Sequence, residues 1–310
     1  MNQPPEKSLI EEAAIFRGMA ASFVEKDWFV TQVIAVLAAL DHPDFTVIFS
    51  GGTALSKGYG LLQRFSEDID FRVRASAPVN RKSLSGFKRA VVETLRQSGF
   101  PLDDDQVHAG DGNRFIAIDL NYQSAFPQAD ALRPHIQIEL TVSDLALPAI
   151  RCAVRSFINE LAHHPPEVAA IDCIDPVESA ADKLSALTWR VTDRVREQVG
   201  DDPSLVRHLH DLAILKDRAL AHPQFPMLAA VVMTRDGERA KNATAFSSLT
   251  VREKFEQMWH RLNADHEYPK EYARFVNRVS YAQAGDTPDF TQALHALRAL
   301  TEAVSDQVTG

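Results

Sequence analysis

Two aspartates separated by a single residue are the first feature of the sequence that could do chemistry. Asp68 and Asp70 lie in a run where polar and apolar residues alternate, DIDFRV (68–73), which is the pattern of a half-buried β-strand. Alternate residues of a strand project from the same face, so we expect the two carboxylates to lie side by side. Because like charges repel unless a cation neutralises them, and oxygen ligands suit hard cations, the pair predicts a site for Mg²⁺ or Mn²⁺.

A glycine pair precedes these aspartates in the sequence. Gly51 and Gly52 follow a β-branched and aromatic run, FTVIF (45–49), which predicts a strand, and they precede a segment that can form a short helix, 53–62. Glycine lets the backbone approach a ligand closely, and the start of a helix favours an anion such as phosphate. A phosphate site and a metal site together suggest that the ligand is a nucleoside triphosphate with its metal ion.

The composition is that of an ordinary globular protein. The chain has 310 residues, of which 45% are hydrophobic, and its 33 Lys and Arg against 42 Asp and Glu give a net charge of −9. This length predicts about two domains, and the acidic balance excludes a general basic coat for nucleic acid but not a local basic groove. Cys152 and Cys173 are too few for a disulfide framework and match no zinc pattern. Without a signal peptide or an apolar run of roughly 20 residues, we expect a cytoplasmic protein with no membrane span.

Hydrophobic periodicity divides the chain into two parts. In the first, it predicts helices over 10–23, 27–40 and 84–98, and strands over 45–49, 68–73, 115–120, 136–142 and 149–157. The second part is predicted to be helical, over 177–198, 204–216, 227–241, 251–263, 271–279 and 290–304. Two prolines, 165 and 166, cannot continue a helix and indicate the linker. The predicted fold class is therefore α+β, with a mixed α/β domain (residues 1–160) followed by an all-helical domain (residues 161–310).

Two motifs at a particular spacing resemble a known family. GGTAL (51–55) and RFSEDID (64–70), preceded by the helix that contains Lys26 and Asp27, resemble the AbiEii/AbiGii nucleotidyltransferase-like toxins. These belong to the polymerase-β-like nucleotidyltransferase superfamily and form the toxin halves of bacterial toxin–antitoxin and phage-defence pairs. The resemblance covers residues 10 to about 220 and fades in the C-terminal helices. It implies a mixed-sheet nucleotidyltransferase core and transfer of a nucleoside monophosphate from a nucleoside triphosphate.

The superfamily has a third carboxylate on a neighbouring strand. Glu139, in the predicted strand 136–142, is a candidate, and Asp119, in the predicted strand 115–120, is its competitor. We favour Glu139 because its strand comes just before the crossover to the helical part, as in the family. The resemblance implies that Asp68, Asp70 and Glu139 form the metal site, while the alternative for Glu139 is an exposed charge on a strand.

The family also has a helix that carries a lysine and, further on, an arginine. Lys183 and Arg190 match these, and helical spacing puts both on one face, where both could reach the same triphosphate. The segment RHLHDL (207–212) matches a family helix segment that ends in Asp-Leu, but His208 stands where an acidic residue is usual. Asp211 remains, and we expect it to orient Lys183 or a ligand as part of the catalytic machinery. The two histidines of this segment point in different directions on a helix, so we do not expect them to bind a metal together.

The remaining expected contacts are to the triphosphate. The resemblance implies that Gly51, Gly52, Thr53 and Ser66 bind the nucleotide, together with Lys183 and Arg190. Ser66 is also a position where regulatory modification is plausible, because a phosphate beside Asp68 and Asp70 would repel the incoming triphosphate. The alternative for Ser66 is a hydroxyl that bonds the local backbone.

The acceptor of the nucleotide is implied by the resemblance alone. We expect it to be RNA, specifically the 3′ end of tRNA, and we expect a cognate antitoxin protein as a partner. Cations of the helical part could supply a local basic strip for RNA: Arg190, Arg194, Arg196, Arg207, Lys216 and Arg218. The alternatives are transfer to a protein side chain, a nucleotide-binding pseudo-enzyme that acts as an interaction module, and a metal-dependent glycosyltransferase that uses the D-x-D pair.

Overall fold

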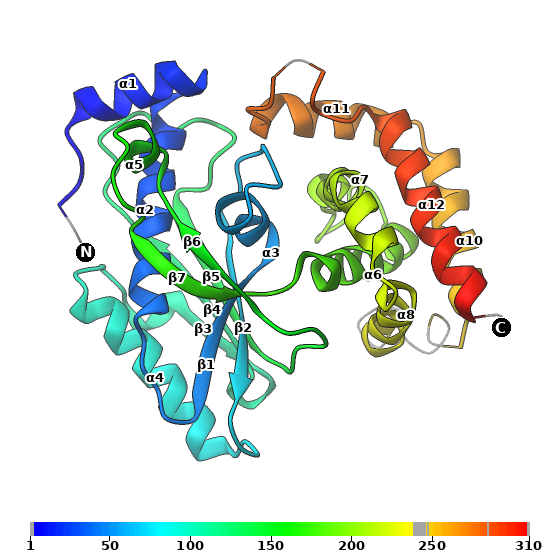
Figure 1. Cartoon of the computed structure of the whole chain (residues 1–310), viewed down its shortest axis with the longest axis horizontal. Helices are drawn as coiled ribbons and strands as arrows, with labels where there is room; N and C mark the ends of the chain where they lie inside the picture. The colour runs from blue at the N-terminus through cyan, green and yellow to red at the C-terminus, as the bar shows by residue number, and fades with distance from the viewer. Residues whose placement is uncertain (1–2, 238–245, 247, 284, 309–310) are drawn as a thin grey trace. The chain divides into compact units, whose positions relative to one another are not determined.

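The chain folds into two compact units, each with its own core. The structure is a computed structural model that describes residues 3–237, 246, 248–283 and 285–308 (Figure 1). The first unit spans Met1–Ile174 and the second Asp175–Gly310. The division therefore comes later than the border expected near residue 160. The reason is that the chain forms one more strand, β7 (Val168–Cys173), after the proline pair, and β7 pairs with β1 (Phe45–Ser50) in the first unit.

A seven-stranded mixed sheet forms the centre of the first unit, with the order β3-β4-β5-β2-β1-β7-β6. Its inner pairs are antiparallel between β1 and β2, and parallel between β2 and β5 and between β1 and β7. The outer pairs are all antiparallel. The strands not yet delimited are β2 (Ile69–Ala75), β3 (Val107–Gly110), β4 (Phe115–Asn121), β5 (His135–Val142) and β6 (Ile150–Val154).

Alternating side chains give this sheet one apolar face. In β2, Ile69, Phe71 and Val73 are buried, whereas Asp70 and Arg72 between them are only half-buried. The apolar side chains join the core made by four helices, of which α2 contacts the other three (Figure 1). The bounds of these helices are α1 (Lys7–Arg17), α2 (Ala21–Ala38), α4 (Arg81–Gln97) and α5 (Phe157–Leu161). The strand pattern read from the sequence is thus confirmed for β2, and it leaves the acidic residues on the face away from the core.

The segment after β1 differs from the short helix expected over 53–62. One turn of α-helix, α3 (Gly51–Thr53), continues into a π-helical turn, η1 (Ala54–Gly58), and then ends. Gly60 has φ +63°, a left-handed conformation that a helix cannot pass through. Three further elements, β3, α5 and β7, were not predicted. They have only four to six residues each, which is too short for periodicity to reveal.

The second unit is built of helices, as predicted. They are α6 (Pro176–Asp193), α7 (Val206–Ala221), α8 (Phe225–Asp236), α10 (Val251–Ala264), α11 (Glu267–Val279) and α12 (Phe290–Val308). Asp175 caps α6 by accepting a hydrogen bond from the backbone N–H of Val177 at 2.7 Å. The last residues of the helix predicted over 227–241, from 238 on, lie outside the described residues. No helix in the part of the chain that the structure describes is both long enough and apolar enough to cross a membrane.

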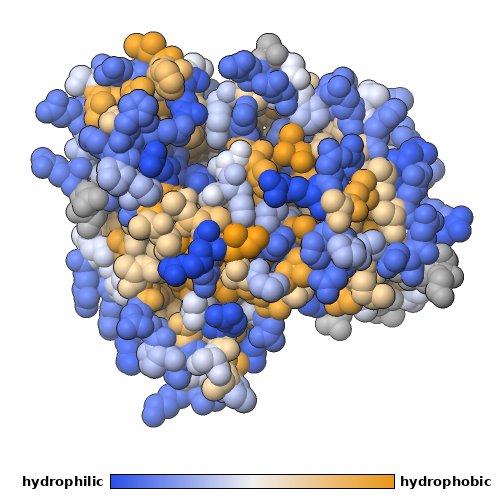
Figure 2. Space-filling view, in the orientation of Figure 1, coloured by the Kyte–Doolittle hydropathy of each residue, from blue (hydrophilic) through white to orange (hydrophobic). Residues whose placement is uncertain are grey.

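Most of the surface in view is hydrophilic, with scattered apolar patches (Figure 2). One such patch lies over α1, whose Ile15 and Phe16 side chains are exposed. Both cysteines are free thiols, as expected from the sequence; Cys173 is buried and Cys152 half-buried. The pKa of the Cys173 thiol is raised by burial and by the neighbouring Cys152, so this thiol stays protonated.

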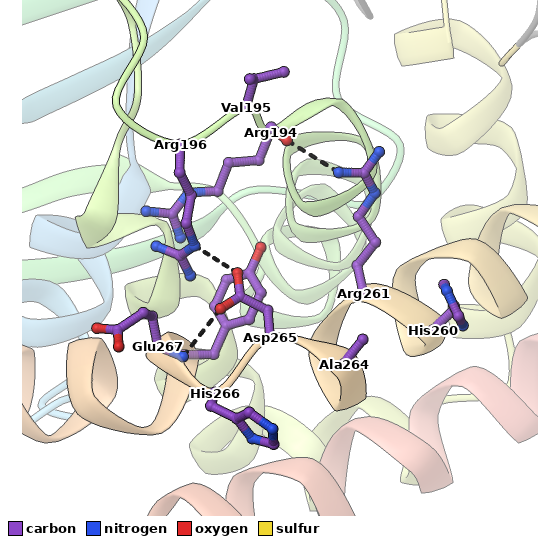
Figure 3. A pocket seen from close by; sticks show the side chains of 10 residues that line it. Arg194, Val195, Arg196, His260, Arg261, Ala264, Asp265, His266 and Glu267 are labelled. Carbon is purple, nitrogen blue, oxygen red and sulfur yellow. Dashed lines mark hydrogen bonds and ion pairs between the residues drawn. The ribbon is translucent and has the colours of Figure 1, made fainter.

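An ion-pair network ends α6 earlier than the predicted residue 198. Arg194 has extended backbone, and its side chain, 4% exposed, donates two hydrogen bonds of 2.7 Å to the carboxylate of Glu271 in α11. Arg196 also donates to Glu271 and to Asp265. Arg194, Arg196 and Asp265 line a pocket of about 780 Å³ (Figure 3). Both guanidinium groups lie over the ring of Tyr268. The network therefore fastens the end of α6 to the start of α11.

We expect Glu271→Gln to lower the free energy of unfolding by about 3 kcal/mol, because it removes the carboxylate shared by Arg194 and Arg196, so that the buried Arg194 charge keeps Asp201 but loses its second acidic partner. Urea denaturation measures this change. The matched control is Glu256→Gln, which removes an exposed pair with Arg252 and should cost less than about 1 kcal/mol. Burial raises the pKa of Glu271, but hydrogen bonds from Arg194 and Arg196 outweigh it and lower the pKa. The stabilisation should therefore be present above the ordinary glutamate pKa and be lost as pH falls through the lower folded-state value. Equal losses for both variants would contradict this role.

Candidate active site

The three candidate carboxylates occur on two neighbouring strands. β2 and β5 pair in parallel with Asp70 directly opposite Glu139, so the two side chains share one face of the sheet. Asp68 comes one residue before β2 begins and, by alternation, belongs to the same face as Asp70. The competitor Asp119 lies on β4 opposite Gln137, one strand further from Asp70. The sheet register therefore puts Glu139, and not Asp119, beside the aspartate pair.

The glycine turn lies against these carboxylates. Gly51 has φ +74°, and a Cβ on this residue would come within 1.8 Å of Asp70 Oδ2. A Cβ on Gly52 would come within 2.7 Å of Arg64 Nη2 and 3.1 Å of Ser66 Oγ. Only glycine can occupy either position without moving a polar side chain. The turn, Asp70 and the Ser66 hydroxyl are thus brought to one place, as expected for a metal–triphosphate site.

The hydroxyl of Thr53 is hydrogen-bonded within the protein. Its hydroxyl donates to the backbone carbonyl of Asp68, and the residue is fully buried. This bond ties the first helical turn after β1 to the start of β2. Thr53, which the resemblance places among the nucleotide-binding residues, therefore engages its hydroxyl within the protein and positions the aspartate.

A cation is already present beside the carboxylates. Arg133 Nη1 donates to Asp68 Oδ1 and to Gln137 Oε1, and Gln137 Nε2 donates to Glu139 Oε1 at 3.0 Å. Carboxylate oxygens are the ligands that Mg²⁺ prefers, so the donor set suits this ion. In the described part of the chain, however, no three His, Cys, Asp or Glu side chains converge closely enough to hold a metal ion. At Asp68 Oδ1, a metal ion would compete with the Arg133 guanidinium for the same oxygen.

Two buried charged residues of α2, Lys26 and Asp27, hold this site in place. In the sequence they were noted only because their helix precedes the GGTAL motif. Lys26 is fully buried, pairs with Glu67, and donates to the backbone carbonyls of Arg133 at 2.7 Å and His135 at 3.0 Å. Burial lowers the pKa of Lys26, and the Glu67 carboxylate opposes this effect. Lys26 thereby joins the residue before Asp68 to the start of β5, the strand that carries Glu139.

The neighbouring Asp27 anchors the other side of the turn. It pairs with Lys57 of η1, and its Oδ2 accepts a hydrogen bond from the backbone N–H of Phe157 at 2.8 Å. Burial raises the pKa of Asp27, and the Lys57 ammonium opposes this shift. An acidic and a basic residue inside an otherwise apolar helical run, VEKDWFV (24–30), are the sequence signal that could have identified these anchors.

In the second unit, Lys183 of α6 and Asp211 of α7 form a buried ion pair. Lys183 Nζ lies 2.8 Å from Asp211 Oδ2, and Asp211 Oδ1 lies 3.2 Å from Nδ1 of His210. The carboxylate of Asp211 thus orients the lysine ammonium, as the sequence suggested. Arg190 follows Lys183 by seven residues, which puts it on the same face of α6. Arg190 and Arg207 both pair with the carboxylate of Asp202.

The basic strip suggested by the sequence is compensated by acids. Arg194 and Arg196 belong to the network with Glu271. Acidic partners within the second unit accompany five of the six cations: Arg190, Arg194, Arg196, Arg207 and Lys216. Arg218 is exposed. The expected strip is therefore a set of ion pairs, because the helices bring Asp201, Asp202, Asp265 and Glu271 next to it.

Comparison with known proteins decides the family. A family model described as nucleotidyl transferase AbiEii toxin, type IV TA system, matches residues 35–296. The chain belongs to the AbiEii family. A solved structure similar to it is MenT4, a nucleotidyltransferase toxin from Mycobacterium tuberculosis, with 20% sequence identity, a TM-score of 0.50, and coverage of 97% of this chain and 99% of that chain. Comparison with curated proteins returns no match.

Membership of the AbiEii family confirms the resemblance read from GGTAL and RFSEDID, and with it the nucleotidyltransferase activity and the toxin–antitoxin class. The likeness to MenT4 confirms the α+β fold with a helical C-terminal part. The match begins at residue 35, later than the resemblance placed from residue 10, and it extends to residue 296, whereas the resemblance fades after about residue 220. The C-terminal helices lack short motifs with chemistry of their own, so only a comparison over the whole length detects them.

The two glycines with positive φ near the site allow a matched test. Gly51→Ala should reduce nucleotide transfer by about 10²-fold, because the new methyl group displaces the Asp70 carboxylate from its position. Gly60→Ala carries the same conformational cost, about 1–2 kcal/mol, but meets no atom within 4 Å. Its activity should stay near wild type. Unfolding and transfer measured on both variants separate strain from displacement, and equal losses of activity would contradict the role of Gly51.

Proposed function

We propose that this AbiEii protein transfers a nucleoside monophosphate from a nucleoside triphosphate to the 3′ end of tRNA, in a Mg²⁺-dependent reaction. The observation that carries the proposal is the register of β2 and β5, which places Asp70 beside Glu139, with Asp70 packed against the Gly51 turn. Paired carboxylates beside a glycine turn suit a triphosphate whose charge is balanced by a divalent ion.

The carboxylates have two tasks. Asp68, Asp70 and Glu139 supply the oxygen ligands for Mg²⁺ or Mn²⁺, and the chemistry this ion provides is neutralisation of the triphosphate charge. One of the three carboxylates accepts the proton of the acceptor hydroxyl. The hydroxyl oxygen then bonds to the α-phosphorus, the bond from that phosphorus to the bridging oxygen breaks, and pyrophosphate leaves. The rate comes from positioning and charge neutralisation, with no covalent enzyme intermediate.

The remaining residues bind the triphosphate. The Gly51–Gly52 backbone and the Ser66 hydroxyl lie beside the carboxylates and contact the phosphates, while Thr53 positions the turn. In the second unit, Lys183, oriented by Asp211, and Arg190 contribute positive charge to the phosphates.

The proposed acceptor and partner are those expected for a toxin of this family. A toxin of a toxin–antitoxin pair that modifies tRNA stops translation, so it acts in the cytoplasm, is held in check by a cognate antitoxin, and serves phage defence. One observation favours a second acceptor, a protein side chain: the cations of the helical unit are paired with acids. Such a surface gives RNA little electrostatic attraction.

Transfer should depend on Asp70 and Lys183. We expect Asp70→Asn and Lys183→Met each to lower the rate of labelled nucleotide incorporation into total tRNA by at least about 10²-fold, as loss of a charge-stabilising group typically does. The controls are Asp119→Asn, on the neighbouring strand β4, and Lys216→Met, on α7, which should retain activity. Each nucleoside triphosphate is tested with Mg²⁺. Label in protein instead of RNA would select the second acceptor, and no label in either would contradict the proposal.

Arg133 should compete with the metal. Removing the guanidinium from Asp68 in Arg133→Ala should tighten Mn²⁺ binding by about two- to fivefold, the range expected for losing a partly exposed ion pair. The control is the exposed Arg114→Ala, which should leave the affinity unchanged. Free Mn²⁺ measured by electron paramagnetic resonance gives the dissociation constants. Weaker Mn²⁺ binding by Arg133→Ala would contradict competition and assign Arg133 a supporting role.

A further inference from the structure

His208 of α7 has two ring nitrogens without hydrogen-bond partners. Both Nδ1 and Nε2 are shielded from solvent, and neither has a partner in the structure. A buried polar group without a partner typically costs about 1–3 kcal/mol, so such groups are rare unless a ligand completes them. The residue as a whole is half-buried.

The surroundings of His208 are rich in positive charge. Arg207 adjoins it on α7, Asp211 lies one turn along α7, and Lys183 and Arg190 of α6 are close enough to act on its charge. Asp211 pairs with Lys183, and Asp202 pairs with both Arg190 and Arg207. Burial, followed by the three cations, lowers the pKa of His208 well below its ordinary value, and Asp211 only partly opposes this. The imidazole is therefore neutral at pH 7, with one nitrogen as donor.

A donor without a partner, beside three cationic side chains, suits an anion with several oxygens. We propose that His208 is a polyphosphate-contacting residue, whose ring N–H donates to a phosphate oxygen of the nucleotide held by Lys183 and Arg190. This inference rests on the proposed function, because it takes Lys183 to contact the triphosphate. It gives a use to the histidine that stands where an acidic residue is usual in the family.

A metal site fits these observations less well. No group of three His, Cys, Asp or Glu side chains in the described residues is arranged to hold a metal, and the three cations around His208 would repel one. A purely structural histidine would be expected to bond a neighbour, as His210 does with Asp211.

Binding of the anion should couple to protonation of the ring. The bound phosphate favours the imidazolium form, so the pKa of His208 in the complex lies above its value in the free protein. Between these two values, binding takes up as much as one proton, and the dissociation constant decreases up to tenfold for each unit by which pH falls. Above both values, His208 contributes only the hydrogen bond.

The experiment is isothermal titration calorimetry of the full chain with inorganic tripolyphosphate and with a non-hydrolysable nucleoside triphosphate, from pH 5.5 to 8. Repeating each titration in buffers of different ionisation enthalpy gives the number of protons taken up. The ligand's own titration is common to all variants, so the difference between wild type and His208→Asn isolates the imidazole. We expect His208→Asn to bind about tenfold more weakly at the acidic end and to lose the extra proton uptake.

His295→Asn, an exposed histidine of α12, is the control and should behave as wild type. His208→Gln serves as the second variant if His208→Asn unfolds, since it also offers an N–H donor that does not titrate. Equal affinity and proton uptake for wild type and a folded His208 variant would overturn the inference, and so would failure of wild type to bind tripolyphosphate. If polyphosphate binds with His208-dependent proton uptake but no nucleotide is transferred, the proposed function fails and this inference stands.

Discussion

Two adjacent buried charges in α2 are the constraint on which the sheet's functional edge depends. Lys26 and Asp27 lie in a helix that is buried on nearly every side, and neither can be there without a partner. Lys26 reaches Glu67 and the backbone before β5, while Asp27 reaches Lys57 beyond the glycine turn. The acidic segment, the turn and the third carboxylate are therefore all held against the same helix. A buried ion pair contributes little net stability, but breaking one is costly, so it enforces one arrangement of these loops.

The same rule, that buried or crowded charges need partners, also governs the rest of the molecule. Arg133 balances Asp68 in the first unit, and Arg194 and Arg196 balance Glu271 in the second. The net charge of −9 consequently says little about any one surface, because opposite charges cancel locally. Neutral polar groups depart from this rule more often, and among the described residues His208 is one whose two ring nitrogens both lack a partner and solvent. Exceptions of this kind indicate function more reliably than the number of charges does.

Much of the first unit could be predicted because its strands are long and alternate clearly. The period of two puts Asp68 and Asp70 on one face, whereas the pairing of β2 with β5 decides that Glu139 lies beside Asp70. The elements that escaped prediction, β3, α5 and β7, are short, and β7 moved the border between the units to Ile174. The end of α6 also escaped prediction. Arg194 continues a helical pattern in the sequence, but it leaves the helix and pairs with Glu271 of α11 and with Asp201 of the loop that follows α6.

The sequence by itself determined the fold class, the family and the residue types of the site, because motifs and periodicity are local properties of the chain. It could not show that the Thr53 hydroxyl is used within the protein, that Arg133 pairs with Asp68, or that the cations of the second unit are paired. These partners lie far apart in the sequence, and only packing brings them together. Tertiary structure therefore decided which charged groups are engaged, since electrostatic energy depends on distance in space and not along the chain.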